Sequence, residues 1–483
     1  MQLSHTRPVA AARFDDPNLV STAGLVPVMA LAQRSGLLTL AAEHLSVPTD
    51  KGANSGRKIG SLVAGMVAGA DSIADMAILR HGAMTTLFDH PYAPSTLGSF
   101  LRTFQFGHVR QLDAVASRLL CALNEHTPVL TGIGTERVMV DIDDSIIEVH
   151  GHSKQGSGYG YSGIRGLNSL ITTVTTDTTA PVITGQRLRK GACGSARGAA
   201  RMIADTLATV GRLRAATMTA NTAVETEEPS EALVKPLVRA DSAYFGYPTI
   251  GAAIRGGADV SITTGLNSVI RAAIATITDD AWTPIRYTNA LYDHDSERWV
   301  SVAEVAEIPF TAFASQKKAH HVPGRLIVRR IPDLRPAQDQ GQRELFDVWR
   351  FHAFFATTDP DEIGTVEADQ MHRRHAIIEQ VHADLKNSAL AHMPSGHFGA
   401  NAAWLVCTVM AFNLTRAAAT LTGDRSLAKA TTATIRRTLI TVPTRIANSA
   451  RRLTLHLPTG WPWEKQWITL FTSMFGRNRP IST

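Results

Sequence analysis

Cysteine is scarce in this sequence, with three residues, Cys121, Cys193 and Cys407, in a chain of 483. They lie far apart and form no C-x-x-C pair, which excludes a disulfide scaffold and a cysteine zinc finger and fits a reducing compartment. The first thirty residues lack the charged start, long apolar stretch and small-residue cleavage site of a secretory signal. The longest apolar run, residues 402–412, is well short of the roughly 20 residues that a membrane-spanning helix needs. We therefore expect a protein of the bacterial cytoplasm with no membrane partner.

Charged residues make up only 19% of the chain, and their distribution is uneven. Residues 387–483 contain eleven Lys and Arg against two acids, Asp424 and Glu464, so this segment carries a net charge of +9. The whole chain carries +6, which leaves −3 for the 386 residues before it. Basic residues gathered on one surface release counterions from a phosphate backbone on binding, so this tail favours a polyanion partner. A solvated helical surface is the alternative that charge alone leaves open.

The spacing of apolar residues divides the chain into segments of different structure. Residues 20–130 show helical periodicity, which fits either a DNA-binding head or a packing domain. From about residue 137, β-branched runs broken by turns predict elements in the order β-β-β-α-β-α-β, which is a mixed α/β sheet. A second β-rich block is interpreted as an insertion into this sheet domain. The predicted segments are a helical N-terminal region at 1–133, the first part of the sheet domain at 134–264, the β-rich insertion at 265–357, the second part of the sheet domain at 358–400, and a basic helical C-terminal region at 401–483.

Residues 158–163, with the sequence GYGYSG, fit the G-x-G-x-x-G fingerprint of dinucleotide-binding sites. That fingerprint must open a helix in a βαβ unit, but here a further strand is predicted through Leu170 and Ile171. A glycine-rich hairpin is therefore the favoured interpretation.

Carboxylates follow two predicted strands. Asp141, Asp143 and Asp144 end an apolar strand, whose alternation places the first two on one face and the third on the other. Asp241 ends a second strand that reads as buried. Sites in α/β sheets collect at the carboxyl ends of strands, and grouped carboxylates suit hard cations such as Mg²⁺ or Mn²⁺. A solvated turn of acids and a helix cap at Asp241 are the structural alternatives.

A predicted helix carries polar residues on one broad face: His372, His375, Glu379, His382 and Lys386. A polar face where an amphipathic helix would otherwise pack indicates a polar partner opposite it. His372, His375 and Glu379 are also a candidate zinc set, although the H-E-x-x-H order of zinc hydrolases is absent.

Five segments carry a combined pattern, and they span nearly the whole chain: VDIDDSIIEVHG, LRKGACGSARGAARM, LVRADSAYFGY, HRRHAIIEQVHADLKNSALAHMPSG and RRLTLHLPTGWPWEKQW. In this combination the chain resembles a DDE transposase of a bacterial insertion sequence, and specifically the insertion-sequence thirteen-eighty family. The resemblance implies an RNase H-like catalytic domain that is interrupted by a β-rich insertion between its second Asp and its Glu.

The resemblance also implies which acids carry the chemistry. In the related cut-and-paste group the first acid precedes a Ser or Thr by two positions, which points to Asp143 before Ser145 and leaves Asp141 as the runner-up. The second and third acids are then Asp241 and Glu379. Their implied cofactor is Mg²⁺, or Mn²⁺.

The wider group carries Y-x2-R-x3-E-x6-K around its glutamate. Glu379 and Lys386 match this pattern, while His372 stands in place of the Tyr and His375 in place of the Arg. Both histidines can hydrogen-bond phosphate, with a charge that depends on pH. The resemblance implies DNA contacts for Lys386 and the two histidines, and for further basic residues: Arg187, Arg189, Lys190, Arg197 and Arg201. A solvated basic patch is the alternative for these further residues.

The implied reaction is cleavage of DNA at the ends of a mobile element, followed by strand transfer, by a two-metal mechanism. The implied partners are double-stranded DNA, as inverted-repeat ends and as target, and a second copy of the chain in a synaptic dimer at the nucleoid. The N-terminal region and the basic tail are the candidates for end recognition. Two alternatives stay open: a catalytically inactive DNA-binding protein with the same fold, and a zinc hydrolase that uses His372, His375 and Glu379.

Overall fold

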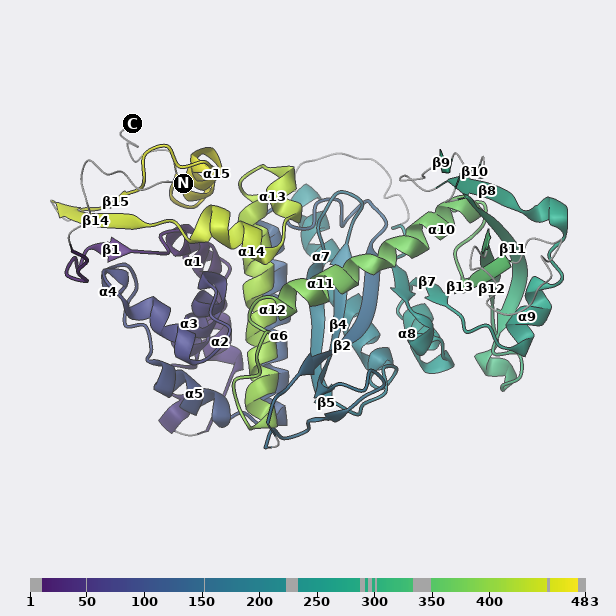
Figure 1. Cartoon of the computed structure of the whole chain (residues 1–483), viewed down its shortest axis with the longest axis horizontal. Coiled ribbons are helices and arrows are strands. Elements are labelled where there is room, and N and C mark those ends of the chain that lie inside the picture. The colour runs from purple at the N-terminus through teal and green to yellow at the C-terminus, as the bar shows by residue number, and fades with distance from the viewer. Residues whose placement is uncertain are drawn as a thin grey trace.

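The computed structural model describes residues 11–48, 50–151, 153–222, 233–286, 292–293, 298–299, 302–332, 349–449 and 452–476. In Figure 1 a central sheet lies between a mainly helical region, to which both ends of the chain contribute, and a second β-rich region. Three residues of the basic tail, Arg451, Arg477 and Arg479, lie outside the described residues.

The central sheet is mixed, as the sequence predicts. Three strands form an antiparallel meander: β2 (Met139–Glu148), β4 (Arg165–Thr175) and β5 (Val182–Lys190). Two further strands, β6 (Leu237–Ala240) and β7 (Asp259–Thr263), extend it on the other side of β2, each parallel to its neighbour. The spatial order is β5-β4-β2-β6-β7, with the short strand β3 (Gly158–Tyr159) pairing with the start of β4. The predicted glycine-rich hairpin is therefore confirmed at residues 158–166.

The β-rich block between β7 and the later helices continues the same sheet. Strand β13 (Trp349–Ala356) pairs antiparallel with β7, and β12 (Val322–Pro332), β11 (Val302–Ala312) and β8 (Thr283–Arg286) follow in antiparallel order. The strands β9 (Tyr292–Asp293) and β10 (Arg298–Trp299) form a separate pair, and helix α9 (Ser268–Ile274) precedes them. The predicted block is thus rich in strands, and it joins the central sheet edge to edge.

Helices connect and cover the central strands. The long helix α7 (Ala199–Thr222) links β5 to β6, and α8 (Tyr247–Arg255) links β6 to β7 and packs against α7. After the β-rich block, α10 (Thr365–Arg373) and α11 (Ile377–Lys386) follow one another across the sheet with one 3₁₀ turn between them, as Figure 1 shows. Helix α11 packs on β2, which brings the predicted glutamate helix to the strand that carries the aspartates.

The two ends of the chain pack together beside the sheet. The N-terminal helices are α1 (Leu25–Arg34), α2 (Leu37–His44), α3 (Ser55–Ala68), α4 (Met84–Leu87), α5 (Pro94–Arg102) and α6 (Phe106–His126). The C-terminal helices are α12 (Phe398–Thr420), α13 (Arg425–Lys429), α14 (Thr432–Ile435) and α15 (Glu464–Phe475). Among the described residues, one large apolar cluster runs from Val20 to Met474 and includes both terminal regions and the sheet.

The C-terminal region is not wholly helical, which corrects the sequence prediction. Strands β14 (Thr444–Ser449) and β15 (Arg452–His456) form a hairpin, and β14 also pairs with β1 (Leu19–Val20) near the other end of the chain. This sheet depends on contacts across more than 420 residues of sequence, which local periodicity does not reveal.

Helix α12 is long and apolar enough to cross a membrane by length and composition, and it is the one unbroken helix with this property in the described part of the chain. Its apolar window is entirely buried, because α12 packs against α3, α6 and β5 at the centre of the terminal region. Apolar residues all around a helix are what such a buried position requires.

Candidate active site

Asp141 lies inside the protein in a saturated ion pair. Its side chain has no solvent exposure, and Arg239 donates from Nε to Oδ1 at 2.8 Å and from Nη2 to Oδ2 at 2.7 Å. His375 Nδ1 lies 2.8 Å from Oδ1, where it donates because the carboxylate accepts. Burial alone would raise the pKa of Asp141, but the charge of Arg239 and the contact with His375 outweigh it and hold this pKa below its usual value. Asp141 therefore has no oxygen left open toward solvent.

Asp143, two residues further along the same face of β2, is in a different situation. Its side chain is 22% exposed, and burial, together with the nearby carboxylate of Asp241, raises its pKa to about 7. The closest basic side chain is that of His382, whose Nε2 lies 3.9 Å from Oδ2, beyond hydrogen-bond range. Burial and the charge of Lys386 lower the pKa of His382 to about 4, so this ring is neutral and does not compensate the carboxylate. Among the described residues, Asp143 thus has no charged partner within 4.0 Å, although Lys386 and His375 act on it from further away.

Asp144 points to the opposite face of β2, as the alternation of the strand predicts. It accepts hydrogen bonds from Asn168 and from the Tyr244 hydroxyl at 2.7 Å, and Arg189 Nη2 lies 3.0 Å from it. Burial raises the pKa of Asp144, but these donors lower it further and leave it below its usual value. Asp144 therefore fixes the ends of β2, β4 and β6 to one another.

Asp241 ends β6 and begins a 3₁₀ turn (Ser242–Tyr244), where its Oδ1 accepts from the backbone N–H of Ala243 at 3.0 Å. Asp241 therefore caps this turn, which is the structural alternative that the sequence leaves open for this residue. Burial raises its pKa, and the carboxylates of Asp144 and Glu379 add to this increase. The capping bond occupies one oxygen and leaves the other, so the cap and a role in a site are compatible.

Glu379 reaches the same region from α11. It lies in the first turn of this helix, its side chain is exposed, and its charge raises the pKa of Asp241. The sequence thus places three carboxylates, Asp143, Asp241 and Glu379, on two adjacent parallel strands and one covering helix, where Asp241 acts electrostatically on Asp143 and Glu379 acts on Asp241. As the side chains stand, the described residues contain no group of three or more His, Cys, Asp or Glu close enough to hold an ion.

The donor chemistry of these three residues nevertheless fits a hard divalent cation. All three offer carboxylate oxygens, and the repulsion between them that raises the pKa of Asp143 and of Asp241 is relieved only by a proton or a bound cation. Zn²⁺ fits less well, because both ring nitrogens of His372 are bonded to Ser261 and Thr263, which removes one nitrogen ligand from the predicted zinc set.

His372 is part of the packing between α10 and the sheet. Its Nδ1 lies 2.8 Å from Oγ of Ser261 and its Nε2 lies 3.0 Å from Oγ1 of Thr263, and its ring stacks on Phe354 at 4.0 Å. Burial, with smaller effects from His375 and Arg239, lowers its pKa to about 3, so it is neutral. His372 therefore does not converge with Glu379 or present a charge to solvent.

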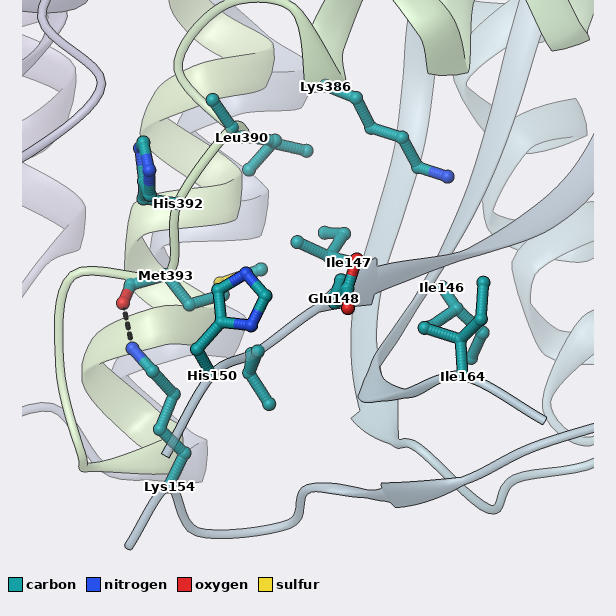
Figure 2. A pocket seen from close by; sticks show the side chains of 12 residues that line it. Ile146, Ile147, Glu148, His150, Lys154, Ile164, Lys386, Leu390, His392 and Met393 are labelled. Carbon is teal, nitrogen blue, oxygen red and sulfur yellow. Dashed lines mark hydrogen bonds between the residues drawn. The ribbon is translucent and has the colours of Figure 1, made fainter. Parts of the chain in front are cut away.

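Lys386 is the predicted DNA contact that lies nearest the acids. Burial lowers its pKa, while its interaction with Asp143 acts in the opposite direction. It also lines a cavity of about 440 Å³ between the end of β2 and the segment after α11. In Figure 2 Lys386 and Leu390 stand on one side of this cavity, and Glu148 and Ile164 stand on another.

The remaining basic residues predicted to contact DNA lie at or near the end of β5. Lys190 and Arg197 are exposed on the turn that follows this strand, Arg187 is half-buried, and Arg201 pairs with Asp205 at 2.9 Å. Arg189 is instead buried, and it donates to Asn168 and to the backbone oxygens of Ser195 and Arg197. Arg189 therefore shapes the turn that carries the exposed cations.

Sequence reasoning missed Arg239 and Tyr244, which hold Asp141 and Asp144. A signal for Arg239 was present, because a charged residue inside the apolar run LVRAD requires a buried countercharge. The parallel register pairs Arg239 directly with Asp141, which identifies that countercharge only once the strands are aligned.

The comparison with protein families agrees with this geometry. The model described as transposase DDE domain group 1 matches residues 2–477. No curated protein matches the chain.

Proposed function

Because the chain belongs to the transposase DDE domain group 1 family, we propose that it is the transposase of a bacterial insertion sequence, which binds the inverted-repeat ends of its element and cuts and joins DNA there. The observation that carries this proposal is the set of three carboxylates from β2, the end of β6 and α11, in which Asp241 acts on Asp143 and Glu379 acts on Asp241. The narrower resemblance to the thirteen-eighty family stays a prediction.

The order of the strands supports an RNase H-like core. Three antiparallel strands followed by two parallel ones, β5-β4-β2-β6-β7, place the carboxyl end of β6 beside the middle of β2, where Asp143 lies. The strands β8 and β11 to β13 come between Asp241 and Glu379 in the chain, which supports their interpretation as an insertion. The carboxyl ends of adjacent parallel strands are where α/β sheets collect their sites.

Asp143, Asp241 and Glu379 are the residues that would hold the metal ions. When bound, Mg²⁺ or Mn²⁺ supplies Lewis acidity that activates water or a 3′ hydroxyl and offsets charge on the phosphate. Asp143 and Asp241 are partly buried, so their charges act through a medium of low dielectric and attract a cation strongly. Both are fixed by secondary structure, which keeps the acids in place before DNA arrives.

Asp141 orients the site without binding metal. It holds His375 through Nδ1, and the charge of His375 when protonated lowers the pKa of both Asp143 and Asp241. His375 therefore faces the two acids with its remaining ring atoms, where it can donate to a phosphate oxygen. This supports His375, rather than His372, as a DNA contact beside the acids.

Cations around the acids support a path for the DNA backbone. Lys386 borders the acids on α11, and Lys190 and Arg197 are exposed on the turn after β5. Weaker candidates for DNA contacts are half-buried Arg187, the basic tail and the N-terminal helices. We also propose that two copies of the chain form a dimer that holds the two DNA ends together, at the nucleoid in the cytoplasm.

The test is cleavage of labelled DNA that carries the element's own ends, with the full chain, in Mg²⁺ and in EDTA. We expect nicks at the ends that leave a 3′ hydroxyl, in Mg²⁺ only, and later joining to a second DNA. Specific binding of the ends without any cleavage, in assembled complexes, would favour the inactive DNA-binding protein. An absence of both binding and cleavage would reject the proposal.

A further inference from the structure

The glycine-rich hairpin between β2 and β4 exposes large apolar side chains that the proposed catalysis does not use. Tyr159 is 67% exposed, Tyr161 is fully exposed, and Ile164 is 44% exposed. Single exposed apolar residues are common on protein surfaces, but three within six residues form a patch. We call residues 158–164 the hairpin tip.

The hairpin tip stands on a fixed base. The backbone N–H of Gly191 donates to the carbonyl of Gly156 at 3.0 Å, and a side chain at Gly191 would collide with the carbonyl oxygens of Gly158 and Gly166. Glycine is therefore required where the hairpin lies against the turn after β5. Gly163, at φ +70°, closes the tip with a hydrogen bond to Gly160 at 3.1 Å. The two tyrosines are thus held out on a hairpin whose base is packed.

The hairpin tip continues the strand that carries the catalytic acids. Asp143 is paired with Ile171, and Glu148 is paired with Gly166, so the base of the hairpin lies five residues beyond Asp143 on both strands. At about 3.3 Å a residue this is roughly 16 Å. Because duplex DNA rises 3.4 Å for each phosphate of a strand, this corresponds to about five base pairs from the acids.

Cations and a cavity surround the hairpin tip. The exposed cations Lys190 and Arg197 lie on the turn that supports it. Ile164 lines the cavity of about 440 Å³ whose other walls include Lys386, and Figure 2 shows Ile164 beside Ile146 at its edge. The tip is therefore an apolar, aromatic projection next to positive charge and about 16 Å beyond Asp143. Bases that are unstacked at an opened DNA end offer apolar faces beside negative phosphates, and this is the combination that such a surface complements.

We propose that Tyr159 and Tyr161 stack on bases of the DNA end a few base pairs from the cut, so that the hairpin tip is a base-stacking element of the transposase. This rests on the proposed function and names one part of its substrate contact. Stacking on aromatic rings tolerates any base sequence, so the tip positions the DNA without reading it. The nearby cations favour DNA over a second protein copy as the occupant.

The test uses photo-cross-linking of the full chain to end DNA that carries 5-iododeoxyuridine at single positions over the first turn of duplex. We expect cross-links to Tyr159 or Tyr161 at positions about five base pairs from the cut. Tyr161→Ala should lose the cross-link and weaken binding of end DNA by roughly tenfold, while Tyr161→Trp, which keeps an aromatic face, should bind like the parent. Val269→Ala is the control, because Val269 is a 64% exposed apolar residue on α9, in the β-rich block and outside the proposed DNA contacts.

The salt dependence of binding separates stacking from charge. Tyr161→Ala removes no charge, so the slope of log K against log salt should stay that of the parent, whereas Lys190→Ala should reduce this slope by about one. Parent-like binding by the Tyr159→Ala and Tyr161→Ala variants, with cross-links elsewhere, would overturn the inference. So would loss of self-association in the free protein with unchanged DNA binding, which would make the tip a protein interface. A parent protein that never binds its ends would instead reject the transposase proposal itself.

Discussion

At the residue scale, two aspartates on one face of one strand have opposite environments. Asp141 is paired with Arg239 and His375, while Asp143 has a raised pKa and, among the described residues, no charged partner within 4.0 Å. Arg239 is 2% exposed, so Asp141→Asn leaves a buried guanidinium without its full counterion. Removing one partner of a buried ion pair costs about 3 to 5 kcal/mol, and we expect the free energy of unfolding in urea to fall by about 3 kcal/mol. Asp143→Asn is the matched control, and an equal loss of stability in both variants would contradict the assignment.

The raised pKa of Asp143 predicts a pH dependence of stability in the metal-free protein. Its folded pKa, about 7, is above the ordinary value of about 3.9, so the native state holds a proton that the unfolded chain has released. Its contribution to stability is therefore present below pH 4 and is lost as the pH rises to 7. In EDTA, the melting temperature of Asp143→Asn should exceed that of the parent by a margin that grows across this range. The corresponding difference in the free energy of unfolding should be on the order of 2 kcal/mol at pH 8, and a difference independent of pH would contradict the prediction.

The candidate acids could be found from the sequence, but their roles could not be separated there. Asp141 and Asp143 alternate onto the same face, and local pattern treats them alike. What distinguishes them is Arg239, which is 98 residues away in the chain and is paired with Asp141 by the parallel register of β2 and β6. Long-range pairing of this kind is invisible to periodicity.

At the scale of elements, the polar residues of α10 and α11 have different surroundings. His372, in α10, has both ring nitrogens bonded to β7, whereas Lys386, in α11, borders the acids and a cavity. We expect Lys386→Ala to reduce the salt slope of DNA binding by about one. His372→Ala should leave that slope unchanged and reduce stability by about 2 kcal/mol, because two buried hydroxyls lose their partner. Titrations of end DNA at several salt concentrations measure these slopes. A lower slope for His372→Ala than for the parent would show that His372 contacts DNA after all.

The regular elements of the central sheet could be predicted because β-branched runs mark strands that are buried. Strands β2, β4 and β5 are the first three strands of the order that the sequence predicts from about residue 137. The hairpin of β14 and β15 could not be predicted in this way. Many of its residues are polar or basic, and its partner β1 lies at the other end of the chain. Such a strand gains its stability from pairing rather than from its own pattern.

At the scale of the whole molecule, the helical ends of the chain and the sheet share one apolar core. Helix α12 packs against α6 and α3 and also against β5, and β1 pairs with β14. We therefore expect a single cooperative unfolding transition for this terminal region and the central sheet, seen alike by tryptophan fluorescence and circular dichroism. A fragment of residues 134–483 should fail to fold, because it loses the partners of α12. Two separate transitions, or a folded fragment, would show an independent N-terminal domain instead.

The most direct test of the account compares rates of end-DNA cleavage in Mg²⁺ by four variants, at equal amounts of folded protein. We predict that Asp143→Asn, Asp241→Asn and Glu379→Gln each lose more than about a thousandfold in rate, since each removes a proposed metal ligand. Asp141→Asn should lose only about 10- to 100-fold, as residues that orient a site do. Parent-like cleavage by Asp143→Asn, together with complete loss in Asp141→Asn, would contradict the account and make Asp141 the first acid.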